Sequence, residues 1–235
     1  MIENIPLNNI LFLDIETVSQ YPDYETLPQH WKKLWNKKSE QIDPEKNPAE
    51  TYPKAGIYAE FGKIIVIAFG HIRPQSNQLQ IKTLYNHNEK KLLQTFLKIF
   101  NKYFDGEQWY LCAHNGKEFD FPYIARRLLI NGFKLPSNFA TYGKKPWEVK
   151  HLDTMQLWRF GDYKAYTSLD LLSTAFGIPS PKNDISGEDV YKIYWQEKNL
   201  PRIAQYCAND VIAVAQLFLK YTGREPIDPK NIKIL

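Results

Sequence analysis

An apolar run near the N-terminus carries two acidic residues, and this combination restricts the fold more than any other feature of the chain. The run reads ILFLDIET, and residues 9–17 are expected to form a buried β-strand. Neighbouring side chains on a strand point to opposite faces, so Asp14 and Glu16 share one face and Ile15 takes the other. Two carboxylates on one buried face repel each other and lose their hydration. A positive partner must offset this cost, and a divalent cation is the simplest one.

Composition places the chain among globular proteins without a strong bias toward one kind of partner. It has 235 residues, 43% hydrophobic and 24% charged, which is enough for one large domain. The net charge of +4 permits a polyanionic partner but does not demand one.

The cysteines and the N-terminus indicate the cellular environment. Cys112 and Cys207 lack the spacing of a metal site and are expected to be buried free thiols in a reducing compartment. The first apolar run is too short for a membrane span, contains Asp14, and lacks the basic start of a signal peptide. The sequence therefore predicts a cytoplasmic protein with no membrane partner.

Hydrophobic periodicity predicts an α/β fold. Three consecutive strands are followed by strands that alternate with helices, which predicts a mixed five-stranded sheet, antiparallel and then parallel, flanked by α-helices. The whole chain, residues 1–235, is expected to be a single domain. After the first strand, further strands are expected at 62–70, 79–85, 109–113 and 147–152, and helices at 88–104, 121–131, 153–159, 167–176, 187–196 and 201–221.

Residues 20–60 differ from the rest and are expected to form an excursion inserted between two strands. They are rich in Pro, Lys, Trp and Tyr, with one short amphipathic stretch at 28–38. Two interpretations of that stretch are open. The favoured one docks Trp31, Leu34 and Trp35 on the core and leaves the lysines in water, and the other uses aromatic and basic side chains to bind single-stranded nucleic acid.

Three later sites carry acidic or amide side chains, and each has an ordinary structural explanation when considered alone. Asp120 stands two residues before a proline, so it alone indicates a helix N-cap. Residues 114–115 alone indicate a turn. Tyr206 and Asp210 lie four apart in a helical segment and share a face, and Asp210 alone would be a solvated acid.

Taken together and in order, these acids resemble the DEDD family of 3′–5′ exonucleases, which have the ribonuclease H-like fold. Asp14 and Glu16 match the first motif of that family, Asp120 the second and Asp210 the third. Tyr206, four residues before the last aspartate, matches the tyrosine subclass (DEDDy).

Other segments narrow the resemblance to the predicted stand-alone exonucleases related to the proofreading domain of family-B DNA polymerases. These segments are residues 61–65, 151–153 and 186–190, and the resemblance extends from about residue 8 to residue 221. The position where a histidine marks the other DEDD subclass holds Gln205.

The resemblance implies two divalent cations, Mg²⁺ or Mn²⁺, held by oxygen ligands. Asp14 would be shared by both cations, Glu16 and Asp210 would complete the first, and Asp120 would hold the second. Tyr206 would orient the attacking water, because a phenol is a poor general base at neutral pH.

The implied reaction releases nucleoside 5′-monophosphates from the 3′ end of single-stranded DNA, with Asn115, Thr17 and Phe119 as substrate-binding residues. For Asn115 a plain turn role remains equally open. An exoribonuclease of the same fold and a catalytically silent nucleic-acid-binding module are the alternatives, since four acids do not distinguish DNA from RNA. DNA replication or repair proteins are the partners that such an enzyme suggests.

Weaker features are expected to be structural. Arg126 and Arg127 are expected on a solvated helix face, with a phosphate contact as the alternative. The loop 163–166 lies near a substrate channel in one interpretation and is plain surface in the other. Asp153 is expected to cap a helix. Loop and first-turn positions are expected for Asp184, Glu188 and Asp189.

Overall fold

A mixed β-sheet forms the centre of the computed structural model, which describes residues 2–73, 75–178 and 185–235. Asp184 lies outside the described residues. The mixed sheet predicted from the sequence is confirmed, and a sixth strand, β6, extends it beside β3. The order is β5-β4-β1-β2-β3-β6, with β1, β2 and β3 antiparallel and the other pairs parallel. The strands are β1 (Ile10–Ser19), β2 (Gly62–Arg73), β3 (Gln78–Tyr85), β4 (Tyr110–Ala113), β5 (Leu152–Asp153) and β6 (Ile232–Ile234).

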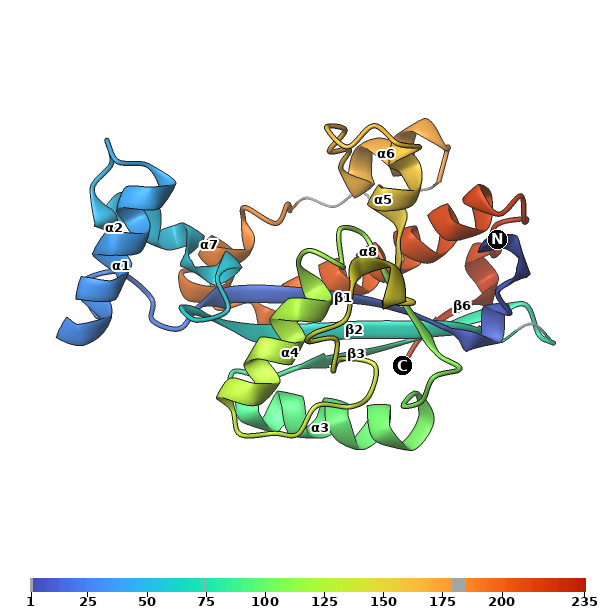
Figure 1. The fold of residues 1–235 in the computed structure, drawn as a ribbon, viewed down its shortest axis with the longest axis horizontal. Coiled ribbons are helices and arrows are strands. Elements are labelled where there is room, and N and C mark those ends of the chain that lie inside the picture. The colour runs from blue at the N-terminus through green and yellow to red at the C-terminus, as the bar shows by residue number, and fades with distance from the viewer. Residues whose placement is uncertain (1, 74, 179–184) are drawn as a thin grey trace.

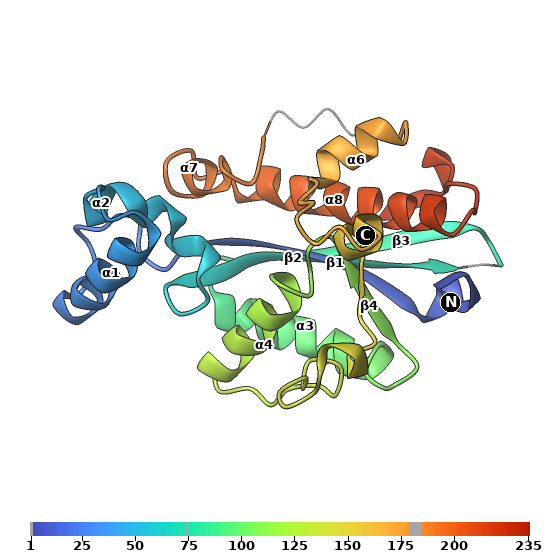
Figure 2. The same ribbon diagram turned by 45° about the horizontal axis from the view of Figure 1, so that its top comes forward.

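Helices cover both faces of this sheet (Figures 1 and 2). Helix α8 (Leu200–Tyr221) packs on one face of β1, β2 and β3, while α3 (Glu89–Tyr103) and α4 (Asp120–Ile130) pack on the other. Alternation along β1 divides its side chains between the two layers, so that Phe12 belongs to the α8 core and Leu13 to the α3–α4 core. The remaining helices are α1 (Gln29–Ile42), α2 (Pro48–Thr51), α5 (Thr154–Arg159), α6 (Leu169–Ala175) and α7 (Val190–Trp195), with 3₁₀ turns at Ile2–Asn4, Leu7–Asn9, Tyr52–Ile57, Pro146–Glu148 and Pro229–Asn231.

Capping residues explain where the two longest layer helices begin. The Asn88 side chain accepts a hydrogen bond from the backbone N–H of Lys91 at 3.1 Å, as expected for the start of α3. Asn199 caps α8 in the same way, Pro201 occupies its first turn, and Gly223 follows its end with a φ of 65°. Among the described residues, no helix combines the length and the apolar character that a bilayer crossing requires.

The excursion between β1 and β2 folds into a lobe at one end of the molecule, drawn in blue at the left of Figure 1. Its small core contains Leu27, Trp35, Tyr52 and Ala55. The Trp35 indole donates to the carbonyl of Pro48 at 2.8 Å. The docked interpretation is supported for Trp35 and for the half-buried Trp31, whereas Leu34 is 39% exposed and does not dock.

Arg127 joins α4 to α3 and to the segment that leads into β2, a role that the sequence did not suggest. Its guanidinium pairs with the Glu89 carboxylate and donates to the carbonyl of Ala59 at 2.7 Å. Glu89 also accepts from the backbone N–H of Ile64 at 2.8 Å. The expectation of a solvated face is therefore wrong for Arg127, which is 4% exposed, and right for Arg126.

Removing the Arg127 guanidinium should destabilise the protein far more than removing its neighbour. Arg127→Ala leaves the buried Glu89 carboxylate without its cationic partner, so we expect a loss of about 3–5 kcal/mol in the free energy of unfolding. Arg126→Ala, on the exposed side of the same helix, is the matched control and should change stability by less than about 0.5 kcal/mol. Urea unfolding measures both, and similar values for the two variants would contradict the buried ion pair.

Candidate active site

Strand β1 places Asp14 and Glu16 on the face of the sheet that α8 covers. Asp14 lies opposite Ala68 of β2, and Glu16 lies opposite Val66. The register shifts directly after Glu16, and such irregularities in a strand re-aim side chains near active sites. The predicted sharing of one face by the two acids therefore agrees with the pairing of the strands.

Asp120 is the first residue of α4, and its side chain does not cap the helix. Phe119 holds the N-cap position, and the Asp120 carboxylate instead accepts a hydrogen bond from the backbone N–H of Ile15 at 3.1 Å. This contact ties the start of α4 to β1 between Asp14 and Glu16. The N-cap interpretation of Asp120 is wrong, because a tertiary donor replaces the local one.

Helix α8 supplies the fourth acid and the tyrosine. Burial raises the pKa of Asp210 to about 6, while a hydrogen bond with Tyr206 lowers it. Burial and the nearby acids, Asp210 first, raise the pKa of the Tyr206 hydroxyl above its usual value, so this phenol remains protonated at neutral pH. The interpretation of Asp210 as a solvated acid is wrong, since this residue is half-buried and its charge acts on the acids of β1.

The four carboxyls act on one another electrostatically. Burial raises the pKa of Asp14 well above its usual value, and the charges of Asp120, Asp210 and Glu16 raise it further. Burial raises the pKa of Glu16 as well, and the charges of Asp210 and Asp120 raise it further. Burial also raises the pKa of Asp120 to about 7, against the opposing hydrogen bond from Ile15. The acids of the three sequence motifs therefore form one cluster, which we call the carboxylate cluster.

Cys207 touches this cluster, a contact that only its place next to Tyr206 in the chain could have indicated. Its thiol is buried and free, as predicted, and lies 3.0 Å from Oδ2 of Asp14 and 3.4 Å from the Asp14 carbonyl. Ligand atoms of Asp14, Glu16 and Cys207 lie within 4.8 Å of one another. Burial raises the pKa of the thiol well above its usual value, so without a cation it stays protonated and donates a hydrogen bond to Asp14. The remaining donors are carboxylate oxygens, which fit a hard divalent cation.

Asp153 organises the loop that leads from β4 into α4. As predicted it caps a helix, accepting from the backbone N–H groups of Met155 and Gln156 at 3.0 and 3.2 Å. It also accepts from the N–H groups of Asn115 and Lys117 at 3.0 and 3.1 Å. This fully buried acid therefore holds the approach to Asp120.

Asn115 lies in this loop with features of both proposed roles. Its φ of 59° is the left-handed conformation of a turn residue. Its side-chain oxygen Oδ1 is buried and has no hydrogen-bond partner within the described chain, although such atoms are normally paired. The turn role is supported, and the unpaired acceptor leaves substrate binding open.

Thr17 follows Glu16 in the chain, Phe119 precedes Asp120, and both contact Tyr123. Thr17 forms a hydrogen bond with the Tyr123 hydroxyl, and the rings of Phe119 and Tyr123 are 5.3 Å apart. Tyr123 in turn donates to the carbonyl of Gly56 at 2.7 Å. Both side chains are half-buried next to the first and second motifs, and their role in substrate binding stays a prediction.

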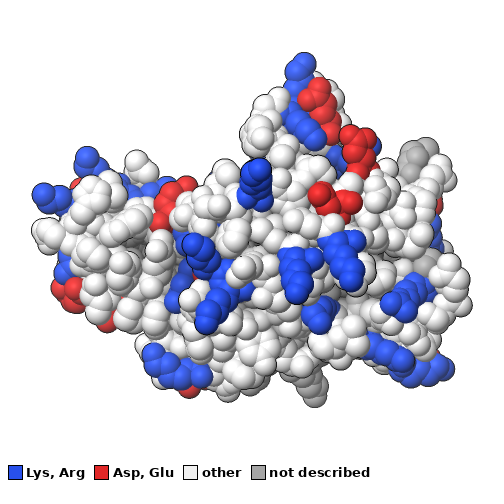
Figure 3. Space-filling model, turned by 90° about the horizontal axis from the view of Figure 1, so that it is seen from below, with Lys and Arg blue, Asp and Glu red and all other residues white. Residues whose placement is uncertain are grey.

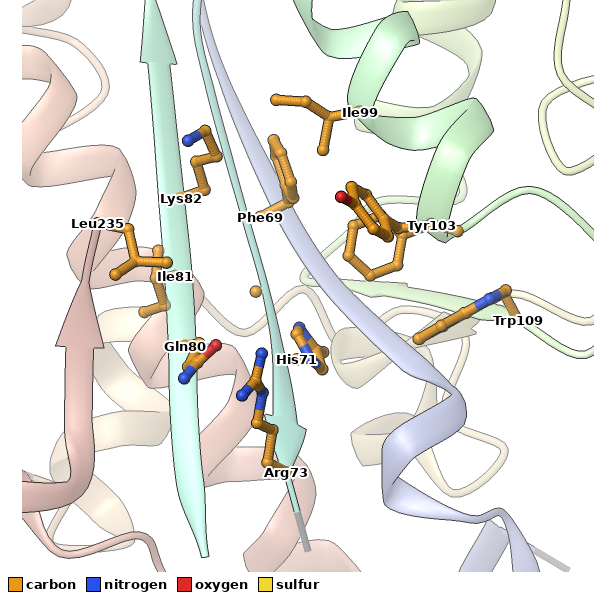
Figure 4. A pocket seen from close by; sticks show the side chains of 12 residues that line it. Phe69, His71, Arg73, Gln80, Ile81, Lys82, Ile99, Tyr103, Trp109 and Leu235 are labelled. Atoms are coloured by element: carbon orange, nitrogen blue, oxygen red, sulfur yellow. The ribbon is translucent and has the colours of Figure 1, made fainter. Parts of the chain in front are cut away.

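A separate pocket lies on the opposite side of the sheet from the carboxylate cluster. It measures about 360 Å³ and is walled by aromatic rings, including Phe69, Tyr103 and Trp109, with Arg73 and Lys82 at its side (Figure 4). Phe69 belongs to the α3–α4 core, whereas Asp14 faces α8. Lys and Arg outnumber Asp and Glu on this side of the molecule (Figure 3). The sheet lies between these surface cations and the carboxylate cluster.

Comparison with known families matches most of the chain to a family model. Residues 57–229 match the model of a family described as predicted 3′–5′ exonucleases related to the exonuclease domain of PolB. The matched segment contains Asp120, Tyr206 and Asp210. Asp14 and Glu16 precede it, so their assignment to the same site rests on the geometry of β1.

The cation-free protein should lose stability as the carboxylate cluster ionises. The pKa of Asp120 is raised to about 7, so its protonated form favours the folded state. That contribution is complete below the ordinary Asp pKa of about 3.9 and is lost as the pH rises through about 7. Asp14 interacts with the other three acids, so Asp14→Asn removes one charge from the cluster. In EDTA, we expect this variant to raise the melting temperature at about pH 8, by a few degrees for each kcal/mol of repulsion removed. At about pH 4, we expect it to change the melting temperature little.

The control for this measurement is Glu107→Gln, which removes an exposed acid. It should leave the melting temperature unchanged at both pH values. A melting temperature of Asp14→Asn equal to or below that of the unsubstituted protein at the higher pH would contradict the repulsion among the four acids.

Proposed function

Since this chain belongs to the family of predicted 3′–5′ exonucleases related to the exonuclease domain of PolB, we propose that it is a two-metal-ion 3′–5′ exonuclease of the tyrosine subclass (DEDDy). Membership indicates a nuclease, and hence a nucleic-acid substrate. The six-stranded mixed sheet with helices on both faces fits the ribonuclease H-like fold of such enzymes. The observation that carries the proposal is that the Asp120 carboxylate accepts a hydrogen bond from the backbone N–H of Ile15, between Asp14 and Glu16, while the charge of Asp210 acts on both of these acids.

The carboxylate cluster is the site that would hold two divalent cations, Mg²⁺ or Mn²⁺. Four acids crowded together, two of them buried, are costly without a positive partner, and oxygen donors suit these hard cations. Asp14 is the acid that we assign to both cations, because the other three acids all act on its pKa. Glu16 and Asp210 would complete one coordination sphere and Asp120 the other. When bound, the cations neutralise charge on the scissile phosphate and the leaving oxygen and make water more acidic.

Tyr206 would orient the attacking water. Its hydroxyl forms a hydrogen bond with Asp210, and its raised pKa keeps the proton in place at neutral pH. A group that remains protonated is unsuited to act as a general base, so positioning by hydrogen bonding is its assigned role.

The proposed substrate is the 3′ end of single-stranded DNA. The water oxygen bonds to phosphorus, the bond from phosphorus to the 3′-oxygen of the preceding nucleotide breaks, and that oxygen leaves with a proton. The terminal nucleotide departs as a nucleoside 5′-monophosphate. Asn115, Thr17 and Phe119 are the residues we assign to binding the terminal nucleotide, and DNA replication or repair proteins are the partners we propose.

Labelled oligonucleotides test this function. The protein is incubated with 3′- or 5′-labelled DNA and RNA strands, with Mn²⁺ or with EDTA. Shortening of DNA from the 3′ end that requires Mn²⁺ supports the proposal, and shortening of RNA alone supports an exoribonuclease. Binding of either strand without any shortening would refute both.

Asp14→Asn should abolish this activity. Loss of the acid assigned to both cations removes several kcal/mol of transition-state stabilisation, so we expect a fall of about 10³-fold or more in kcat/KM. Glu107→Gln is again the control and should retain full activity, because its side chain is exposed in the turn between α3 and β4 and takes no part in the carboxylate cluster. Activity of Asp14→Asn within about tenfold of the unsubstituted protein would remove the basis of the two-cation proposal.

Tyr206→Phe should slow turnover without loss of cation binding. The ring remains while the hydroxyl that positions water is lost, so kcat should fall by about 10²-fold while Mn²⁺ affinity by calorimetry stays the same. Tyr221→Phe removes a hydroxyl from the same helix, where that ring stacks on Trp158, and should leave kcat unchanged. Equal losses of kcat and Mn²⁺ affinity in Tyr206→Phe would show a structural role instead.

A further inference from the structure

The loop between α5 and α6 presents three large aromatic side chains to solvent. Phe160, Tyr163 and Tyr166 are 88%, 82% and 68% exposed, and we call residues 160–166 the aromatic loop. Single exposed aromatic residues are ordinary, but a group of three within one short loop marks a contact surface. Phe160 also has a φ of 43°, a conformation that is unfavourable for a bulky residue. The chain thus holds the Phe160 ring outward at an energetic cost.

Arg159 fixes the shape of the aromatic loop. Its Nε donates to the carbonyl of Ala165 at 3.1 Å, and its guanidinium lies 4.6 Å from the centre of the Tyr166 ring. The same guanidinium is 3.6 Å from the carboxylate of Glu118, in the loop that leads to Asp120. The Arg159 side chain is almost fully buried, so the exposed rings rest on a rigid base that is joined to the active-site loop.

His114 and Asp170 place the aromatic loop beside the carboxylate cluster. His114 lies next to Asn115, and its Nε2 donates to the carbonyl of Thr167 at 2.9 Å while Nδ1 lies 2.9 Å from the Thr154 hydroxyl. The charge of Asp170, at the start of α6, raises the pKa of Asp210. Figure 1 shows α5 and α6 standing on the side of the sheet that α8 covers. A turn role therefore does not fully describe His114, since its side chain also links the loop before α4 to the segment between α5 and α6.

We propose that the aromatic loop is a platform on which the unpaired bases of the substrate strand stack as its 3′ end enters the carboxylate cluster. The inference rests on the proposed function. Every base has a flat apolar face, so stacking on exposed rings binds single strands with little regard to sequence. Paired bases in a duplex are stacked on each other and do not offer these faces, so the platform would select single strands.

The aromatic loop carries one exposed cation that fits a polyanionic strand, beside the exposed acids Asp162, Glu118 and Asp170. Lys164 is exposed between Tyr163 and Tyr166 and can contact phosphate. Asp162 is the acid within the loop, and its carboxylate accepts from the backbone N–H of Lys164 at 3.1 Å. This hydrogen bond orients the Asp162 carboxylate toward the backbone of the loop.

The variant Phe160→Ala/Tyr163→Ala tests the platform and leaves the anchored Tyr166 in place. In EDTA, which prevents turnover, its affinity for a labelled strand of about 16 nucleotides should fall by roughly tenfold or more in fluorescence anisotropy. With Mn²⁺, the KM for that strand should rise while hydrolysis of a dinucleotide, which is too short to reach the platform, stays unchanged. Phe160→Trp/Tyr163→Trp keeps two stacking surfaces and should retain the affinity.

Tyr103→Ala is the matched control, because Tyr103 is an exposed aromatic residue in the pocket on the opposite side of the sheet (Figure 4). It should leave strand affinity unchanged. Unaltered affinity in the double alanine variant, or an equal loss of long-strand and dinucleotide hydrolysis, would overturn the platform. Failure of the unsubstituted protein to cleave any strand would refute the proposed function alone, since the binding measurement does not depend on cleavage.

Discussion

Repulsion among four converging carboxyls, those of the buried Glu16 and Asp120 and of the half-buried Asp14 and Asp210, is the interaction on which the rest of this structure depends. Asp14 and Glu16 come from a central strand, Asp120 from the start of α4, and Asp210 from α8. Burial alone disfavours each charge, and every neighbour of the same sign adds to the cost. A fold that brings such groups together gains nothing from them in stability. Their convergence is understandable as a site for cations, because cations convert the repulsion into binding energy.

The surrounding structure prevents the four acids from moving apart. The backbone N–H of Ile15 holds the Asp120 carboxylate, and the Cys207 thiol holds that of Asp14. Asp153 fixes the loop before α4, and Arg127 fixes α4 itself through Glu89. These contacts use buried polar groups that are themselves paired, so the site is preorganised before any cation binds.

Much of the site followed from short-range geometry in the sequence. Alternation on a strand placed Asp14 and Glu16 on one face, and the helical repeat placed Tyr206 and Asp210 together. The direction of the Asp120 side chain did not follow, because the local N-cap rule competes with a donor 105 residues away in sequence. The prediction for Arg127 was wrong for the same reason, since its partner Glu89 lies on another helix. The short strand β6 has only three residues, too few to show a period.

Diffraction from crystals grown with Mn²⁺ examines the proposed cation site without reference to activity. An anomalous difference map should contain two peaks about 3.5–4 Å apart, both in contact with the Asp14 carboxylate. One of them should also contact Glu16 and Asp210, and the other should lie toward Asp120. Crystals of Asp14→Asn grown in the same way should lack the pair. A map of the unsubstituted protein with no Mn²⁺ among these four acids would contradict the assignment of this cluster as the catalytic centre.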